Sequence, residues 1–301
     1  MTYEENQTMT KIFSIVAATD FSPGSSAAVE RAVQLAVAHG ASLRLLHAFD
    51  VSAWHSLKGV FDPQRLTLSP PPDVRMQQHL TDLAASLMTQ TGLEVEARFT
   101  VGDADSAINA YVTAHDISLV VIGSRAEPAM PGLGSTASKV VRSPACPILI
   151  VRSTVSRPYD KVLSAVDMRD GSIRAASGAI MLFPAAHHHL LYAVDPALER
   201  ALWMGDVARE QTQVLHDSMH AKAVRQLEQL AQELTKDAVH QVTAEVVDDV
   251  PARAIALRAA ALPADCVAVG HHGQGAVAEH LLGSMAQHVL HHTLRDVLVV
   301  P

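Results

Sequence analysis

Three apolar segments in the first half of this chain recur in the second half in the same order. The pairs are 14–20 with 161–167, 119–123 with 267–270, and 147–151 with 296–300. The first two pairs share an offset of about 147 residues, while the last pair is about two residues further apart, so the first copy is the shorter one. A repeat of this size requires a single fold that the chain builds twice.

A polar segment separates the two copies. Residues 152–160 (RSTVSRPYD) contain Pro158 and no apolar run, which is typical of a linker. We therefore expect one domain over residues 11–152 and a second domain over residues 160–301. The total of 301 residues agrees with two domains of ordinary size.

Short apolar runs alternate with helical periodicity in both copies. The runs are rich in Val, Ile and Leu, as in strands that are buried on both faces of a parallel sheet. The expected strands are 13–19, 43–49, 94–100, 118–123 and 147–151, followed by 161–166, 188–194, 241–247, 265–270 and 296–300. This alternation predicts an α/β fold with a doubly wound, Rossmann-like sheet in each copy. Ligands of such sheets bind beyond the carboxyl ends of the strands.

The ends of several helices can be predicted from local signals. Ser22 is expected to cap the first helix, Pro23 to occupy its first turn, and Gly40 to end it. Its buried face is expected to contain Val29, Ala32, Val33, Ala36 and Val37. The other helices are expected over 73–91 and 103–115, after 134–135, and, in the second copy, over 206–235.

A glycine motif follows the fourth expected strand of the second copy. It consists of Gly270, His271, His272 and Gly273, nine intervening residues, and then Gly283 and Ser284 ahead of a helical segment that starts at Met285. Glycines permit close approach of the backbone, and the N–H groups of a helix N-terminus suit a phosphate. Asp167 ends the first strand of this copy and is expected to accept hydrogen bonds from a ribose or an adenine amine across the same cleft. The motif therefore predicts a nucleotide site.

With this motif in its strand context, the chain resembles a tandem member of the universal stress protein family over nearly its whole length after residue 11. Members carry a strand that ends in Asp and, later in the domain, Gly-x2-Gly-x9-Gly-Ser/Thr. The resemblance implies two adenine nucleotide alpha hydrolase-like domains, each a five-stranded parallel sheet of order 3-2-1-4-5 with helices on both faces. It also implies ATP as the ligand, with Mg or Mn as a candidate accompanying ion. The residues implied to contact ATP are Asp167, Ala193, Gly270, His271, His272, Gly273, Gly283, Ser284 and Met285.

The first copy departs from this motif. Ala126 stands where the second glycine is expected, and only seven residues separate it from Gly134. Pro128 and Pro131 stiffen the shortened loop. We expect a weaker site here, with another ligand or none as open alternatives. Its residues are Asp20, Ala48, Gly123, Gly134, Ser135 and Thr136.

Charge and composition exclude several other classes. The net charge of −8 argues against a nucleic-acid binder or a binder of anionic membranes, and no apolar run is long enough for a membrane span. The polar N-terminus lacks the pattern of a secretory signal, and the two cysteines, Cys146 and Cys266, suit a reducing compartment. We therefore expect a cytoplasmic protein in which both cysteines are core residues.

The 17 histidines do not by themselves predict a metal site or a catalytic residue. His288 and His292 have a spacing that can hold a metal, but no further ligand at a recognised spacing accompanies them. His271 and His272 are expected in the phosphate loop, and the remaining histidines at a solvated surface. The residues 187–189 form a histidine triplet at the start of a strand, where neighbours alternate between faces.

Three hypotheses for function follow from these patterns. The first is a regulator of the stress response that binds ATP in its second domain and is not an enzyme. The second is a slow ATPase or a nucleotidyl-transfer enzyme with a substrate pocket in the first domain. The third is a scaffold in which ATP is only structural. As partners we expect an adenine nucleotide, no nucleic acid and no membrane. We also expect an internal pseudo-dimer through strands 147–151 and 296–300, and a further homodimer stays open.

Overall fold

The structure is a computed structural model of the 301-residue chain. It describes residues 12–50, 70–125, 132–152, 154, 157–197, 209–235, 241–271 and 282–301. The chain divides into two compact units, one spanning Thr10–Val155 and the other containing Ser156–Pro301. We call these the N-terminal unit and the C-terminal unit.

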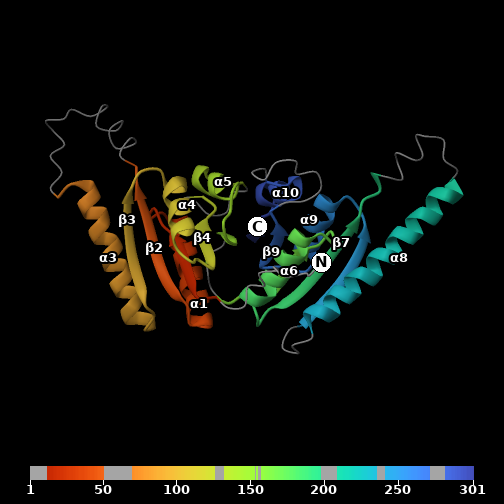
Figure 1. The fold of residues 1–301 in the computed structure, drawn as a ribbon, viewed down its shortest axis with the longest axis horizontal. Coiled ribbons are helices and arrows are strands. Elements are labelled where there is room, and N and C mark those ends of the chain that lie inside the picture. The colour runs from red at the N-terminus through yellow and green to blue at the C-terminus, as the bar shows by residue number, and fades with distance from the viewer. Residues whose placement is uncertain are drawn as a thin grey trace, which may run out of the picture. The chain divides into compact units, whose positions relative to one another are not determined.

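The N-terminal unit contains five parallel strands. They are β1 (Ser14–Ala18), β2 (Ser42–Phe49), β3 (Val95–Val101), β4 (Leu119–Gly123) and β5 (Ile148–Val151). Their order is β3-β2-β1-β4-β5 (Figure 1). The helices of this unit are α1 (Pro23–His39), α3 (Pro72–Thr91), α4 (Ala104–Ala114) and α5 (Ser135–Val140).

The C-terminal unit repeats this arrangement. Its strands are β6 (Lys161–Ala165), β7 (His187–Val194), β8 (Gln241–Asp248), β9 (Cys266–Gly270) and β10 (Asp296–Val300). They are parallel and lie in the order β8-β7-β6-β9-β10. The helices are α6 (Asp170–Leu182), α8 (Arg209–Leu234), α9 (Pro251–Ala261) and α10 (Ser284–His292). The predicted fold class and the strand order 3-2-1-4-5 are confirmed in both units.

Helices cover both faces of each sheet. Because crossovers between parallel strands are right-handed as a rule, the strand order puts α1 and α3 on one face and α4 and α5 on the other, and α4 packs against α5. In the C-terminal unit α9 packs against α10, while α8 runs along β7 and β8 (Figure 1). Leu227 and Leu230 of α8 anchor that helix in a core cluster with Val166, Ala176 and Leu190. Among the described residues, none of the helices combines the length and the hydropathy that a membrane span needs.

The ends of α1 agree with the local signals, and its buried face agrees in part, because Val29, Ala32 and Ala36 are buried as expected. Ser22 accepts a hydrogen bond from the N–H of Ser25, and Gly40 ends the helix in the left-handed conformation at φ 61°. Val37, expected in the core, is 54% exposed, and Val33 is only half-buried. Ala28 and Leu35 are buried instead.

A close backbone contact explains this rotation of α1. A Cβ on Gly123 of β4 would lie 2.6 Å from the carbonyl oxygen of Gly24, so the first turn of α1 touches the end of β4. Ala28 and Leu35 follow Gly24 on the same helical stripe, and this stripe therefore faces the sheet. The pattern of the valines alone could not reveal a contact between distant glycines.

Both cysteines are buried, as expected, and neither forms a disulfide within the described part of the chain. Burial raises the pKa of the Cys146 thiol to about 12, so this side chain is not a nucleophile at neutral pH. Cys266 has no exposed surface. The described thiols are therefore core residues.

Candidate functional site

A cavity of about 510 Å³ opens at the carboxyl ends of β1, β2 and β4 in the N-terminal unit. This volume falls within the range of about 300–1,000 Å³ that is common for small-molecule sites. The cavity is lined by all six residues that were predicted for the weaker site: Asp20, Ala48, Gly123, Gly134, Ser135 and Thr136. Arg125 also lines it and adds a positive charge.

A tight turn presents Asp20 at the end of β1. Phe21 follows it in the left-handed conformation at φ 63°, which is uncommon for a residue other than glycine and typical of functional sites. The N–H of Ser22 donates to Oδ1 of Asp20 at 3.0 Å, and the N–H of Asp20 donates to Oγ of Ser25 at 3.3 Å. The turn is thus held by hydrogen bonds on both sides of the carboxylate.

The Asp20 carboxyl is ionised at neutral pH. Burial raises its pKa, but the hydrogen bonds from Ser22 and Ser25 together outweigh burial, so the net pKa lies below its ordinary value. An ionised carboxylate in a half-buried cavity accepts hydrogen bonds from hydroxyl or amine groups. Asp20 is therefore suited to hold the hydroxyl groups of a sugar.

The end of β4 and the start of α5 are joined by backbone hydrogen bonds. The N–H of Ser124 donates to the carbonyl of Val151 at 2.9 Å, and the N–H of Gly134 donates to the carbonyl of Ser124 at 2.6 Å. A Cβ on Gly134 would lie 3.2 Å from that same carbonyl oxygen, which is a tight contact. This clamp brings the start of α5 to the mouth of the cavity.

The C-terminal unit builds the same turn after β6. Met168 has φ 63°, like Phe21, and directly follows Asp167. The N–H of Asp167 donates to Oγ of Ser172 at 3.1 Å, and Oδ1 of Asp167 accepts from the N–H of Arg169 at 3.1 Å. Asp167 therefore occupies the position that Asp20 holds in the N-terminal unit.

The glycine contact and the backbone clamp also recur. A Cβ on Gly270 would lie 2.8 Å from the carbonyl carbon and oxygen of Gly171, which matches Gly123 and Gly24. The N–H of His271 donates to the carbonyl of Val300 at 2.7 Å, and the N–H of Gly283 donates to the carbonyl of His271 at 2.8 Å. The start of α10 is thus tied to the end of β9.

The strand ends bring the predicted residues of the C-terminal unit to one edge of its sheet. Asp167 follows β6, Ala193 lies near the end of β7, and Gly270 ends β9, which are three adjacent strands. Ser284 and Met285 begin α10, whose N-cap Gly283 makes no side-chain hydrogen bond to the first turn. Its N-terminal N–H groups and the positive end of its dipole suit an anion. His272 and Gly273 lie outside the described residues.

The two framework copies differ in their side chains. Arg169 stands where the N-terminal unit has Ser22, and its Nε lies 3.8 Å from Oδ2 of Asp167. His271, expected in the phosphate loop, instead has a buried side chain, as does its counterpart Ser124. The hydrogen bonds to Val300 and Gly283 are made by the backbone of His271.

His288 and His292, whose spacing can hold a metal, gain no further ligand from the described part of the fold. Their rings are 4.3 Å apart. The group that does come together is His216, His220 and Asp248. The signal for it was present, because His216 and His220 have the same spacing as His288 and His292.

These features define a class of protein: two parallel α/β units, each with a ligand framework at the carboxyl ends of its strands. The sequence matches the universal stress protein family over residues 12–152 and again over residues 158–301. The chain therefore belongs to the universal stress protein family and carries two copies of its domain. A search of curated proteins found no significant match.

Solved structures agree with this assignment. A universal stress protein from Archaeoglobus fulgidus DSM 4304 is 17% identical, with a TM-score of 0.68 over 95% of this chain and 97% of its own. A protein described as functionally unknown, from Pseudomonas aeruginosa PAO1, is 20% identical, with a TM-score of 0.66 over 96% and 92% of the two chains. At these identities the likeness concerns the fold. A universal stress protein in complex with cAMP is 26% identical over 48% of this chain and 98% of its own, with a TM-score of 0.35.

Proposed function

We propose that this chain is a cytoplasmic regulator of the stress response that binds ATP in its C-terminal unit. The observation that carries the proposal is the recurrence of one framework. The turn at Asp167, the close contact at Gly270 and the clamp at Gly283 each match a feature that surrounds the cavity of the N-terminal unit. The C-terminal copy adds the complete Gly-x2-Gly-x9-Gly-Ser motif to this framework.

The adenosine part of ATP is assigned to the strand ends. The carboxylate of Asp167 is about 40% exposed and has one oxygen, Oδ2, that no backbone N–H in the turn occupies. That oxygen also faces Nε of Arg169 at 3.8 Å, and in the proposed site it accepts from the hydroxyl groups of the ribose as well. Ala193, at the end of β7, offers backbone groups at a position where a small side chain leaves room for the adenine ring.

The phosphates are assigned to the start of α10. This helix has nine residues, so its dipole and its first N–H groups make a site for an anion. The hydroxyl of Ser284 adds a donor in the first turn. With Mg or Mn as a companion ion, oxygen atoms of the phosphates would supply most of the ligands.

The N-terminal unit is proposed as a weaker adenine-nucleotide site. Its cavity and its Asp20 turn are complete, and Arg125 supplies a positive charge for a phosphate. The loop to Gly134 is two residues shorter than in the C-terminal copy and lacks the second glycine. Fewer backbone groups are therefore available to wrap a triphosphate.

A slow ATPase is the second candidate, and the cavity argues against an efficient one. Phosphoryl transfer requires a positioned base and a cation clamp. Among the residues that line the described cavity, Asp20 and Arg125 are the charged ones, and Asp20 is held in its turn by Ser22. We therefore expect binding without efficient turnover. Phosphate release above a few turnovers per hour would favour the enzyme instead.

Calorimetric titration of nucleotide-free protein tests the proposal. We expect ATP to bind with a Kd of micromolar order and GTP at least about tenfold more weakly, because in the proposed site the backbone groups near Ala193 recognise adenine. Cyclic AMP should compete with ATP for the adenosine end but gain nothing from the start of α10. Equal affinities for ATP and GTP would contradict the assignment of an adenine site. If ATP raises the melting temperature but changes no interaction with a partner, the scaffold hypothesis is favoured over the regulator.

A further inference from the structure

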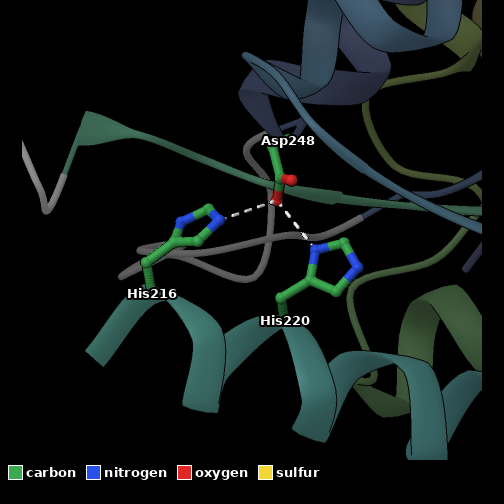
Figure 2. Close-up of side chains that lie close together, drawn as sticks. All are labelled: His216, His220 and Asp248. Atoms are coloured by element: carbon green, nitrogen blue, oxygen red, sulfur yellow. Dashed lines mark hydrogen bonds and ion pairs between the residues drawn. The ribbon is translucent and has the colours of Figure 1, made fainter. Parts of the chain in front are cut away.

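Three side chains of the C-terminal unit converge at the outer end of its sheet. His216 and His220 lie one turn apart on α8, and Asp248 is the last residue of β8. Figure 2 shows both imidazole rings turned toward the same carboxylate. Nε2 of His216 is 3.5 Å from Oδ1 of Asp248, and Nδ1 of His220 is 2.9 Å from that same oxygen.

The packing of α8 fixes the position of the two histidines. Ala223, Leu227 and Leu230 are buried against the sheet. His216 and His220 continue this same stripe toward the N-terminus of the helix, because their spacing repeats that of a helical turn. The stripe therefore changes from apolar to imidazole where it reaches the end of β8.

We propose that His216, His220 and Asp248 form a binding site for a divalent transition-metal ion, with zinc as the preferred one. Two imidazole nitrogens and one carboxylate oxygen are a common protein ligand set for zinc. Ligand atoms about 2.0–2.1 Å from a tetrahedral zinc ion lie about 3.3 Å from one another. The two distances to Oδ1 of Asp248 bracket this value, and all three ligand atoms lie within 4.8 Å of one another.

The surroundings of the three side chains permit entry of an ion. The exposed fractions are 18% for the His216 side chain, 34% for His220 and 44% for Asp248. The neighbouring carboxylate of Asp249 is engaged with the N–H of Val250 and with Arg253, so it does not add a fourth ligand. Three protein ligands leave the fourth position of a tetrahedral ion open to water.

Zinc titration of the metal-stripped, nucleotide-free full chain tests this site. We expect one zinc ion per chain to bind with a Kd of micromolar order or tighter, and magnesium, which prefers oxygen ligands, not to bind there. The double variant H216A/H220A should weaken zinc binding at least about tenfold. D248N should do the same while preserving the shape of the side chain, so it answers the question even if the double variant does not fold.

The matched control is H288A/H292A, which removes a second histidine pair at the same helical spacing. This variant should bind zinc like the unchanged protein. Visible absorption of bound cobalt(II) gives an independent readout, because its intensity reports a low coordination number. The proposal is overturned if zinc does not bind, if D248N and H216A/H220A bind zinc unchanged, or if the control loses zinc to the same extent.

Discussion

Replacement of Gly270 by Ala should destabilise the C-terminal unit by about 2–3 kcal/mol. The added Cβ would lie 2.8 Å from the carbonyl carbon and oxygen of Gly171, and 3.1 Å from the N–H nitrogen of Ser172. These are backbone atoms of the first turn of α6, so no flexible side chain can move aside. The strain must be relieved by a shift of α6 away from β9, which uncovers apolar surface.

Gly178 provides the matched control for this experiment. It lies within α6, and a Cβ there would meet only Cγ2 of Val300 at 3.6 Å, an ordinary contact. Gly178→Ala should therefore leave stability unchanged or raise it by about 0.5–1 kcal/mol. Thermal unfolding followed by circular dichroism measures both variants. A melting temperature of Gly270→Ala equal to that of Gly178→Ala would show that the contact between β9 and α6 is not tight.

Replacement of Asp167 by Ala should lower ATP affinity by a factor of about 10–100, because a hydrogen bond to a charged group contributes about 1.5–3 kcal/mol. In the proposed site this carboxylate accepts the hydroxyl groups of the ribose. The measurement is a calorimetric titration with ATP, with the melting temperature as a check that the turn at Met168 survives.

Asp20→Ala is the comparison variant, since Asp20 holds the equivalent position in the N-terminal unit. Asp20→Ala should leave the affinity of the proposed tighter site, in the C-terminal unit, unchanged. The proposed assignment to the C-terminal unit fails if Asp20→Ala removes tight binding while Asp167→Ala retains it. Loss of tight binding in both variants would mean that the two sites do not act independently.

Local signals in the sequence were sufficient for much of the fold. Ser22 and Gly40 mark the two ends of α1 as expected, since a helix cap and a left-handed glycine act over a few residues. The strands β1, β4, β5, β9 and β10 were equally readable from their apolar runs, whereas β3 and β8, also expected as buried on both faces, are partly exposed because each has a neighbouring strand on one side only. Only the placement of Val33 and Val37 in the buried face of α1 was wrong, because that face depends on the contact between Gly24 and Gly123, which are distant in the sequence.

The candidate sites show the same division between local and distant information. The residues of the glycine motif are close in the sequence, and their spacing pointed to the edge of the sheet where the structure has its described members Gly270, Gly283 and Ser284. The left-handed conformation of Phe21 and Met168 has no signal in either residue type. The pairing of His220 with Asp248 spans 28 residues and depends on how α8 packs against β8.

The two units thus share a framework but differ in what completes it. In the N-terminal unit the sequence between Gly123 and Gly134 is two residues shorter than its counterpart, and Arg125 lines the cavity. The C-terminal unit has the longer loop and begins a nine-residue helix at Ser284. This difference is the physical basis for expecting one tight nucleotide site and one weak site in each chain.

The nucleotide content of the purified chain tests this central claim most directly. The protein is denatured by heat, and the released nucleotide is identified and quantified by chromatography. We expect about one ATP per chain, because only the tighter site should retain its ligand through purification. Absence of nucleotide, together with no rise in melting temperature on addition of ATP, would contradict the account and leave the glycine motif with a structural role only.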